Sequence, residues 1–235
     1  MPLIGSPATL STGALIAVAT LWGAVTGALL PRPAYRLSVE PDEPWRPGPG
    51  WAGVRPGPPA PLLAAVTALV CALLAAATGT RPELGAWLLL APLGVLLATV
   101  DFAVHRLPDV LTLPFAVLCA GALGVAALLP EPGGSWRSAG LGALGMGAFY
   151  LVLHLANSRA MGFGDVKLAL GLGAALGWYG LGVLFIGVFA GVLLNGLFAL
   201  VLVVARRAGR KTEIPFGPFM LLGAYAGVLL GALAA

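Results

Sequence analysis

Long apolar runs, separated by short polar or proline-rich breaks, dominate this sequence of 235 residues. A transmembrane helix needs about 20 mostly apolar residues, because the hydrocarbon core of a bilayer is about 30 Å thick. The sixth run is short and rich in glycine, so we expect it to be tilted or buried among its neighbours. The pattern predicts about eight transmembrane helices, over residues 9–30, 60–79, 84–102, 109–129, 137–156, 165–178, 181–205 and 215–234.

The stretch between the first two runs is the only sizeable segment outside the predicted helices. Residues 31–60 are rich in Pro, Gly and Trp, and they offer little apolar material for a core. We therefore expect an irregular loop against the membrane surface. No Lys or Arg precedes Arg32, so the first run lacks the charged region of a signal peptide and is expected to be a retained anchor. This organisation predicts an anchor at 1–30, a loop at 31–60 and a membrane-embedded domain at 61–235.

Basic residues fall almost entirely in alternate connections between the predicted helices. Lys and Arg are enriched in cytoplasmic connections. With the N-terminus outside, eleven basic residues lie inside and two, Arg81 and Arg137, lie outside. The bias predicts an outside N-terminus and a cytoplasmic loop at 31–60. The eleven are Arg32, Arg36, Arg46, Arg55, Arg106, Arg159, Lys167, Arg206, Arg207, Arg210 and Lys211.

Composition restricts the class of protein. Hydrophobic residues make up 59% of the chain and charged residues 9%, with a mean hydropathy of +0.97, whereas soluble domains carry about 25% charged residues. We therefore expect an all-α, polytopic membrane bundle rather than a cytosolic enzyme, a secreted disulfide scaffold or a disordered chain. The net charge of +4 is not gathered into a stripe, so no nucleic-acid partner is expected. Cys71 and Cys119 lie in apolar runs without a CxxC pair and are predicted to be small apolar fillers.

Three of the nine acidic residues lie at the edges of predicted helices. Asp101 ends the third, Asp109 follows in HRLPD, and Asp165 begins the sixth after MGFG. An acid at the edge of an apolar span is costly to bury and often marks function, although a charge at the membrane interface is the alternative. His154, within a span, is expected to bridge helices through a hydrogen bond. The other acids are predicted to be solvated loop residues: Glu40, Asp42, Glu43, Glu83, Glu131 and Glu213.

Asp101 and Asp165 both fall at cytoplasmic ends of predicted helices, so their carboxyl groups can share one depth. Two close carboxylates do not both ionise readily, and one keeps a proton while the other stays charged. Such a pair can activate a water molecule and protonate a leaving amine. Gly162 and Gly164 flank Phe163 just before Asp165, where glycine gives backbone freedom and leaves room for a substrate.

Four segments of the chain resemble the type IV prepilin peptidase family, the GxGD membrane aspartic proteases. ATVDFAVHRLPDVLTLP (98–114) and GFGDVKLALGLGAALG (162–177) are similar to its two signature blocks. EIPFGPFMLLGA (213–224) resembles the C-terminal block, and TGALLPRPAYRL (26–37) resembles the N-terminal one. The resemblance implies that Asp101 and Asp165 are the catalytic pair of a peptidase domain at 61–235. It implies supporting roles for Asp109, Gly162, Gly164 and Lys167.

The resemblance also implies a substrate and a location. Members remove a short basic leader from prepilin-like and pseudopilin precursors, after a glycine, at the cytoplasmic face of the bacterial inner membrane. The peptidase reaction requires no cofactor. Long members carry a zinc-binding domain with CxxC pairs in the first cytoplasmic loop, but residues 31–60 hold no cysteine, so a thiolate zinc site is excluded there and the chain resembles a short form. Many long members also methylate the new N-terminus with S-adenosylmethionine, for which this sequence shows no glycine-rich loop.

Other functions compete with a peptidase. Intramembrane acids can couple protons or cations in a small carrier, but a carrier site is expected near the midplane, and both acids are predicted at one face. A non-catalytic scaffold of pilus or secretion assembly would not need both acids and both glycines. Within the peptidases, an archaellin-like or other membrane protein is an alternative substrate.

Overall fold

The computed structural model describes residues 11–39, 43–46, 58–158, 161–205 and 214–235. These residues form nine helices and no strand, and eight of the helices correspond in order to the eight predicted spans. The prediction of an all-α polytopic bundle is confirmed. The helices are α1 (Thr12–Leu29), α2 (Pro31–Leu37), α3 (Ala60–Thr78), α4 (Glu83–Val104), α5 (Asp109–Ala126), α6 (Trp136–Ala156), α7 (Phe163–Trp178), α8 (Leu181–Val204) and α9 (Gly217–Ala234).

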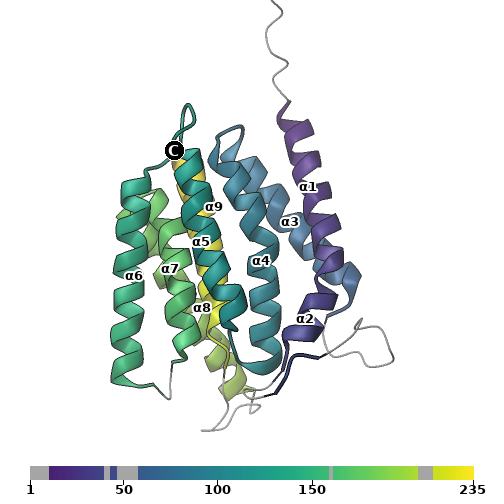
Figure 1. Cartoon of the computed structure of the whole chain (residues 1–235), viewed down its shortest axis with the longest axis vertical. Coiled ribbons are helices and arrows are strands. Elements are labelled where there is room, and N and C mark those ends of the chain that lie inside the picture. The colour runs from purple at the N-terminus through teal and green to yellow at the C-terminus, as the bar shows by residue number, and fades with distance from the viewer. Residues whose placement is uncertain (1–10, 40–42, 47–57, 159–160, 206–213) are drawn as a thin grey trace, which may run out of the picture.

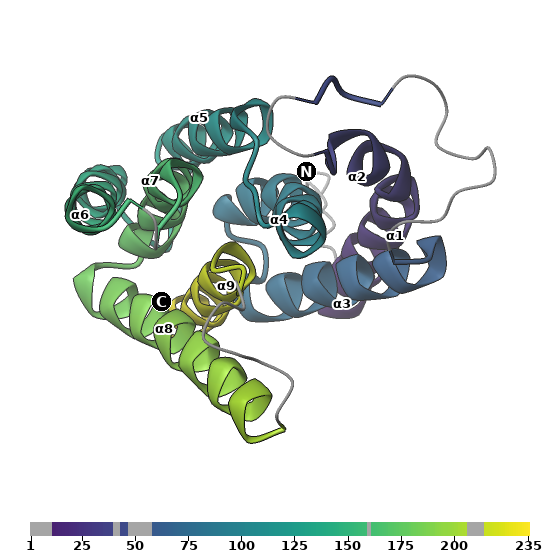
Figure 2. The same cartoon turned by 90° about the horizontal axis from the view of Figure 1, so that it is seen from below.

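The long helices run alternately up and down the bundle (Figure 1). The C-terminal ends of α4, α6 and α8 and the N-terminal ends of α5, α7 and α9 lie at the lower end in this view, together with α2, and the C-terminus lies at the upper end. Seen from below, α4 occupies the middle, α5, α6 and α7 lie to one side, and α1 and α3 lie to the other (Figure 2).

The alternating direction of the helices places the described basic residues at the two ends of the bundle in the groups that their positions in the sequence predict. Arg81 lies between α3 and α4, and Arg137 lies in the first turn of α6, both at the upper end. The orientation of the bundle across the membrane stays a prediction from this charge bias. Arg32, Arg36, Arg46, Arg106 and Lys167 belong to the lower end, whereas Arg55, Arg159, Arg206, Arg207, Arg210 and Lys211 lie outside the described residues.

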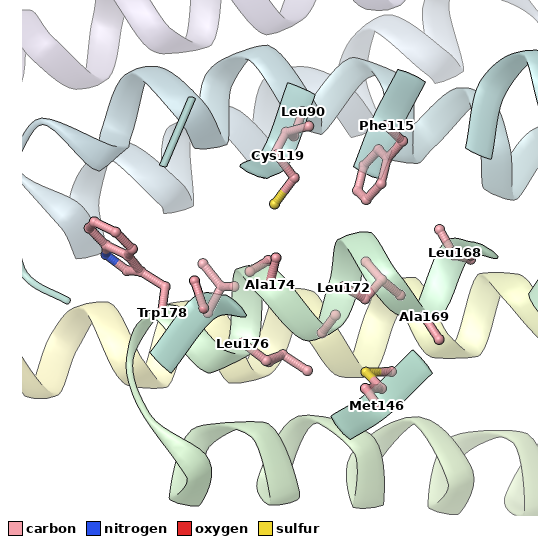
Figure 3. Packing of buried hydrophobic residues seen from close by; sticks show 14 of the residues in the cluster. Leu90, Phe115, Cys119, Met146, Leu168, Ala169, Leu172, Ala174, Leu176 and Trp178 are labelled. Atoms are coloured by element: carbon pink, nitrogen blue, oxygen red, sulfur yellow. The ribbon is translucent and has the colours of Figure 1, made fainter. Parts of the chain in front are cut away.

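The short helix α7 is enclosed by its neighbours. Seven helices in the described part of the chain are long and apolar enough to cross a membrane, but α7 has 16 residues and reaches only about 24 Å. Figure 3 shows Leu168, Leu172 and Leu176 of α7 among side chains of the surrounding helices, and all three are at most 3% exposed. The prediction that this segment is buried among neighbours is confirmed.

Both cysteines are free and fully buried, as predicted for small apolar fillers. The Sγ of Cys119 on α5 donates to the carbonyl oxygen of Gly171 on α7 at 3.3 Å. Figure 3 shows Cys119 and Phe115 pointing from α5 toward α7. Because the thiol is small, α5 can lie close to α7 at this level.

Glycine contacts bring pairs of helices close together. A Cβ atom on Gly142 of α6 would collide with the carbonyl of Gly173 on α7, and one on Gly173 would collide with Gly142. Gly23 of α1 meets the α3 backbone in the same way, and Gly223 of α9 meets α8. Lipid tails are as apolar as leucine, so close van der Waals packing must hold membrane helices together. The Gly/Ala content of the sequence therefore serves helix pairing.

The prediction that residues 31–60 are wholly irregular is wrong for the first seven, which form α2. Pro31 is the first residue of this helix, where a missing N–H costs nothing and the fixed φ of proline suits the helix. Ala34 is buried in a cluster with Leu96 and Val100 of α4. Tertiary packing thus holds a segment that its composition does not identify, while the domain boundaries at 30 and 60 stay predictions.

The prediction that Glu83 is solvated is wrong, since its side chain is fully buried at the upper end of the bundle. Both of its carboxylate oxygens accept from the Gly133 amide, at 3.1 and 3.2 Å. The Tyr179 hydroxyl donates to it at 3.4 Å, and Arg81 lies 3.9 Å away. Arg81 also donates to the carbonyl of Ala232 on α9. Glu83 starts a helix, where an acid is ordinarily favourable without burial, so its local sequence does not reveal this network.

Replacing Glu83 with Gln should destabilise the bundle. Gln offers one acceptor oxygen where the carboxylate offers two to the Gly133 amide, and it carries no charge for Arg81. We expect a loss of about 1–3 kcal/mol of unfolding free energy, as for other buried polar groups left unsatisfied. Thermal denaturation of the purified protein in detergent should show a clearly lower Tm. Glu131→Gln is the matched control, because Glu131 is exposed; equal Tm values for the two variants would contradict the role of Glu83.

Candidate active site

The three candidate acids all lie at the lower end of the bundle. Asp101 is in the last turn of α4, Asp109 is the first residue of α5, and Asp165 is in the first turn of α7. Asp101 is 4% exposed, the Asp109 side chain is 62% exposed, and Asp165 is half-buried. Residues that are 64 positions apart in the sequence are thus brought to one end of the molecule.

The carboxyl group of Asp101 is held from a third helix. Its Oδ2 accepts a hydrogen bond of 3.0 Å from the backbone amide of Gly217, the first residue of α9. A Cβ atom at position 217 would lie 2.7 Å from that oxygen, so only glycine permits this approach. The C-terminal block around Gly217 therefore positions Asp101.

Asp165 is held by the segment that precedes it. Its Oδ2 accepts from the Gly162 amide at 3.2 Å, and its own amide donates to the Gly162 carbonyl at 3.2 Å. This reciprocal pair caps the N-terminus of α7. Asp165 also lies within range of electrostatic interaction with Asp101 and His154. The two carboxyl groups thus belong to one electrostatic environment.

The two acid-bearing segments meet at Leu107, in the connection between α4 and α5. A Cβ atom on Gly164 would lie 2.8 Å from Leu107 Cβ and 2.9 Å from Leu107 O. A Cβ atom on Gly217 would lie 3.1 Å from Leu107 Cδ1. The second glycine of the GFGD segment is therefore needed for close packing.

The expectation that these glycines provide unusual backbone angles is wrong. Gly162 has φ −69°, which any residue can adopt, and Gly164 lies within α7. The left-handed glycines among the described residues are Gly79 and Gly180.

Asp109 and Lys167 form an ion pair with 2.6 Å between Lys167 Nζ and Asp109 Oδ2. Lys167 Nζ also lies 4.8 Å from the centre of the Phe163 ring, a cation–π contact. The pair connects the first residue of α5 to the first turns of α7. The structure thus brings together the two charged residues that the family resemblance assigns to supporting roles.

Helix α6 contributes two residues to this end of the bundle. Tyr150 was not identified from the sequence, and His154 was expected to bridge helices through a hydrogen bond. His154 Nδ1 donates to the carbonyl of Met161 at 2.8 Å, and its ring lies 5.4 Å from that of Phe163. The bond reaches the segment before α7 rather than a neighbouring helix. Tyr150, one turn earlier, is 2% exposed, packs 6.0 Å from the Phe216 ring and lies within electrostatic range of Asp165. Tyr150 and His154 are four residues apart, so they lie on the same face of an otherwise apolar helix. A search of the sequence for polar side chains at this spacing can identify them.

The arrangement suits acid–base chemistry. Two carboxyl groups on different helices, one buried and one half-buried, interact within a site held by backbone amides. One such group can accept a proton from water while the other donates a proton to a leaving group. Within the part of the chain that the structure describes, no three His, Cys, Asp or Glu side chains are grouped so as to hold a metal ion.

Comparisons with known proteins point to one family. Residues 88–204 match the sequence model of the Type IV leader peptidase family. The chain is 33% identical over 186 residues to a prepilin leader peptidase/N-methyltransferase of Aeromonas hydrophila and 30% identical over 174 residues to one of Pseudomonas aeruginosa. Each match covers 73% of this chain and 58% of the relative. A relative from Burkholderia pseudomallei is 34% identical over 142 residues, or 57% of this chain and 43% of its own. No solved structure matches the chain significantly.

Substitution of the two GFGD glycines should have unequal effects. Alanine is the better helix former by about 1 kcal/mol, yet Gly164→Ala should lower the Tm, because its Cβ would push the α7 start away from Leu107. Gly162→Ala is the matched control, since its nearest neighbour would be Asp165 Oδ2 at an ordinary 3.5 Å. Thermal denaturation in detergent compares the two. A Gly164→Ala protein as stable as Gly162→Ala would show that the contact with Leu107 is not required.

Proposed function

Because the chain belongs to the type IV leader peptidase family, we propose that it is an aspartic endopeptidase that removes the basic leader from prepilin-like and pseudopilin precursors. The observation that carries the proposal is the meeting of Asp101 and Asp165 at one end of the bundle. The match spans 58% of the length of the first two relatives, whose printed names also include N-methyltransferase.

In the proposed reaction, water is the nucleophile. One carboxylate accepts a proton from water as the water oxygen bonds to the scissile carbonyl carbon. The C–N bond then breaks, and the other aspartic acid donates its proton to the leaving amine. One water is consumed, and a new carboxyl end and a new amine end are formed. Proton occupancy belongs to the pair Asp101 and Asp165 rather than to either residue.

Backbone amides prepare both carboxyl groups for this exchange. Gly217 N–H occupies Oδ2 of Asp101 and Gly162 N–H occupies Oδ2 of Asp165. We assign proton exchange to the two Oδ1 atoms, because the amide hydrogen bonds engage Oδ2 of each carboxyl group. Since the amides stay in place through the reaction, the site needs little reorganisation as charge moves.

We propose that the reaction takes place at the cytoplasmic face of a bacterial inner membrane. The bias of Lys and Arg toward the connections at the end of the bundle that carries the acid pair supports this side. A basic leader would be drawn there by the anionic headgroups of the cytoplasmic leaflet. The carrier alternative is not favoured, because the two acids lie at a helix end instead of at the midplane.

Asp101→Asn and Asp165→Asn should each abolish leader removal while the protein stays inserted and abundant. An amide can neither accept the water proton nor donate the acid proton. The measurement is the intact mass of a pilin-like precursor, co-expressed with each variant in cells that lack their own prepilin peptidase. Loss of the leader with the wild-type chain is expected, and an added methyl mass would reveal methylation of the new N-terminus.

Glu131→Gln is the matched control, since it removes an exposed acid at the opposite end of the bundle. It should process the precursor as the wild type does. Leader removal that continues after either aspartate substitution would contradict the aspartyl mechanism. A precursor left whole by the wild-type chain would overturn the peptidase function for that substrate.

Lys167→Ala should slow cleavage without stopping it. The residue pairs with Asp109 and so connects α5 to α7. Because the pair is partly exposed, we expect a loss of about twofold to tenfold in rate. Asp109→Asn should give a similar loss, and the double variant should be no slower than either single one. Complete loss with Lys167→Ala would assign that residue a direct part in the reaction.

A further inference from the structure

One peptide group lies between His154 and Asp165. The imidazole Nδ1 of His154, in the last turn of α6, donates to the carbonyl oxygen of Met161 at 2.8 Å. The amide of the next residue, Gly162, donates to Oδ2 of Asp165 at 3.2 Å. That carbonyl and that amide belong to one peptide bond, which is planar and trans. Its two polar ends therefore point in opposite directions, one to the imidazole and the other to the carboxyl group.

The carbonyl oxygen decides which atom of His154 must carry a proton. A carbonyl group can only accept, so Nδ1 is the donor in this bond. A neutral imidazole with its proton on Nδ1 meets this requirement, and so does an imidazolium ion. The bond therefore needs a donor at the Nδ1 position and does not need a charge.

Side-chain packing does little to orient this peptide group at Gly162. The residue is exposed, and a Cβ atom there would meet only Oδ2 of Asp165 at 3.5 Å and the amide nitrogen of Gly164 at 3.9 Å. No atom of another helix lies within 4 Å of that position among the described residues. The bond from His154 supplies a restraint from α6 that the glycine itself cannot supply.

His154 also contacts the residue that follows Gly162. Its ring centre lies 5.4 Å from that of Phe163, and Lys167 Nζ lies 4.8 Å from the same Phe163 ring. His154 thus reaches the residues on both sides of Gly162, through a hydrogen bond to Met161 and a ring contact with Phe163.

We propose that His154 is a positioning residue for Asp165 and acts through the peptide group between Met161 and Gly162. The inference rests on the proposed peptidase function and adds a residue of α6 to its site. Donation to the carbonyl oxygen polarises the peptide group and strengthens the hydrogen bond that its N–H donates. Oδ2 of Asp165 is thereby kept engaged, and Oδ1 is the atom to which proton exchange is assigned above.

This role predicts an effect on the rate of the chemical step. A small displacement of a reacting group lowers the rate even when binding is unchanged. The bond joins two parts of the chain and includes no substrate atom, so its loss should lower kcat and leave KM nearly constant. Since one hydrogen bond is involved, the expected loss is about tenfold.

His154→Leu and His154→Asn form a matched pair for the kinetic test. Leucine and asparagine branch at the same carbon and have nearly the same shape, but only asparagine places an N–H donor near the position of Nδ1. Leucine is apolar and suits a membrane helix. With a pilin-like precursor, we expect His154→Leu to lose about tenfold in kcat with KM within about twofold, and His154→Asn to recover most of the loss.

The same pair separates positioning from a simple effect of charge. A cation in the last turn of a helix is favourable in itself, and neither leucine nor asparagine can carry one. A His154→Asn protein as slow as His154→Leu would therefore contradict the role of the hydrogen bond. An unchanged kcat with His154→Leu, or a loss that appears only in KM, would overturn the proposal as well.

NMR spectroscopy tests the peptide group without any substrate. Labelling with carbonyl-13C methionine and 15N glycine selects Met–Gly peptide bonds, and the sequence has two, at 146–147 and 161–162. In detergent, His154→Leu should move the 161–162 signal and leave the 146–147 signal of α6 in place. His154→Asn should leave both near their wild-type positions. A 161–162 signal that does not respond to His154→Leu, or equal movement of both signals, would overturn the proposal.

The two hypotheses can fail separately. A wild-type chain that cuts no precursor would overturn the peptidase function, while the 161–162 signal would still decide whether His154 holds the peptide group. A chain that cuts the precursor, but whose 161–162 signal does not respond to His154→Leu, would overturn the positioning role alone.

Discussion

The hydrogen bond from the Gly217 amide to Asp101 is the interaction on which the candidate site depends. A carboxyl group that is 4% exposed at the end of a membrane helix needs a partner. The donor comes from the start of α9, and glycine is required there because a side chain would strike the carboxyl oxygen. This one contact joins the segment around Asp101 to the C-terminal segment around Gly217.

The rest of the structure keeps that contact in place. Leu107 packs against Gly164 and Gly217, so three helix ends meet around one side chain. His154 and Tyr150 of α6 support the segments that carry Asp165 and Gly217 from the other side. At the far end, the network around Glu83 holds the same bundle together. An apolar cavity of about 990 Å³ remains between α3, α4 and α9.

Properties that depend on local composition could be predicted from the sequence. The number and order of the long helices follow from apolar length, because the bilayer sets that length. The burial of α7 could be predicted because its apolar run is short and rich in glycine. Asp101 and Asp165 stand out because an acid beside an apolar run is costly wherever it folds. Their placement at one end follows from the alternating direction of successive spans.

Only the tertiary structure decided what those elements touch. Glu83 looks like an ordinary acid at a helix start, and its burial depends on Gly133 and Tyr179, which are distant in the sequence. Gly164 is needed against Leu107 rather than for its backbone angles. The sequence by itself determined the spans, their alternation and the candidate acids, since length and charge act locally. The partners of each polar group and the apolar cavity between α3, α4 and α9 were decided by packing, because they depend on which surfaces meet.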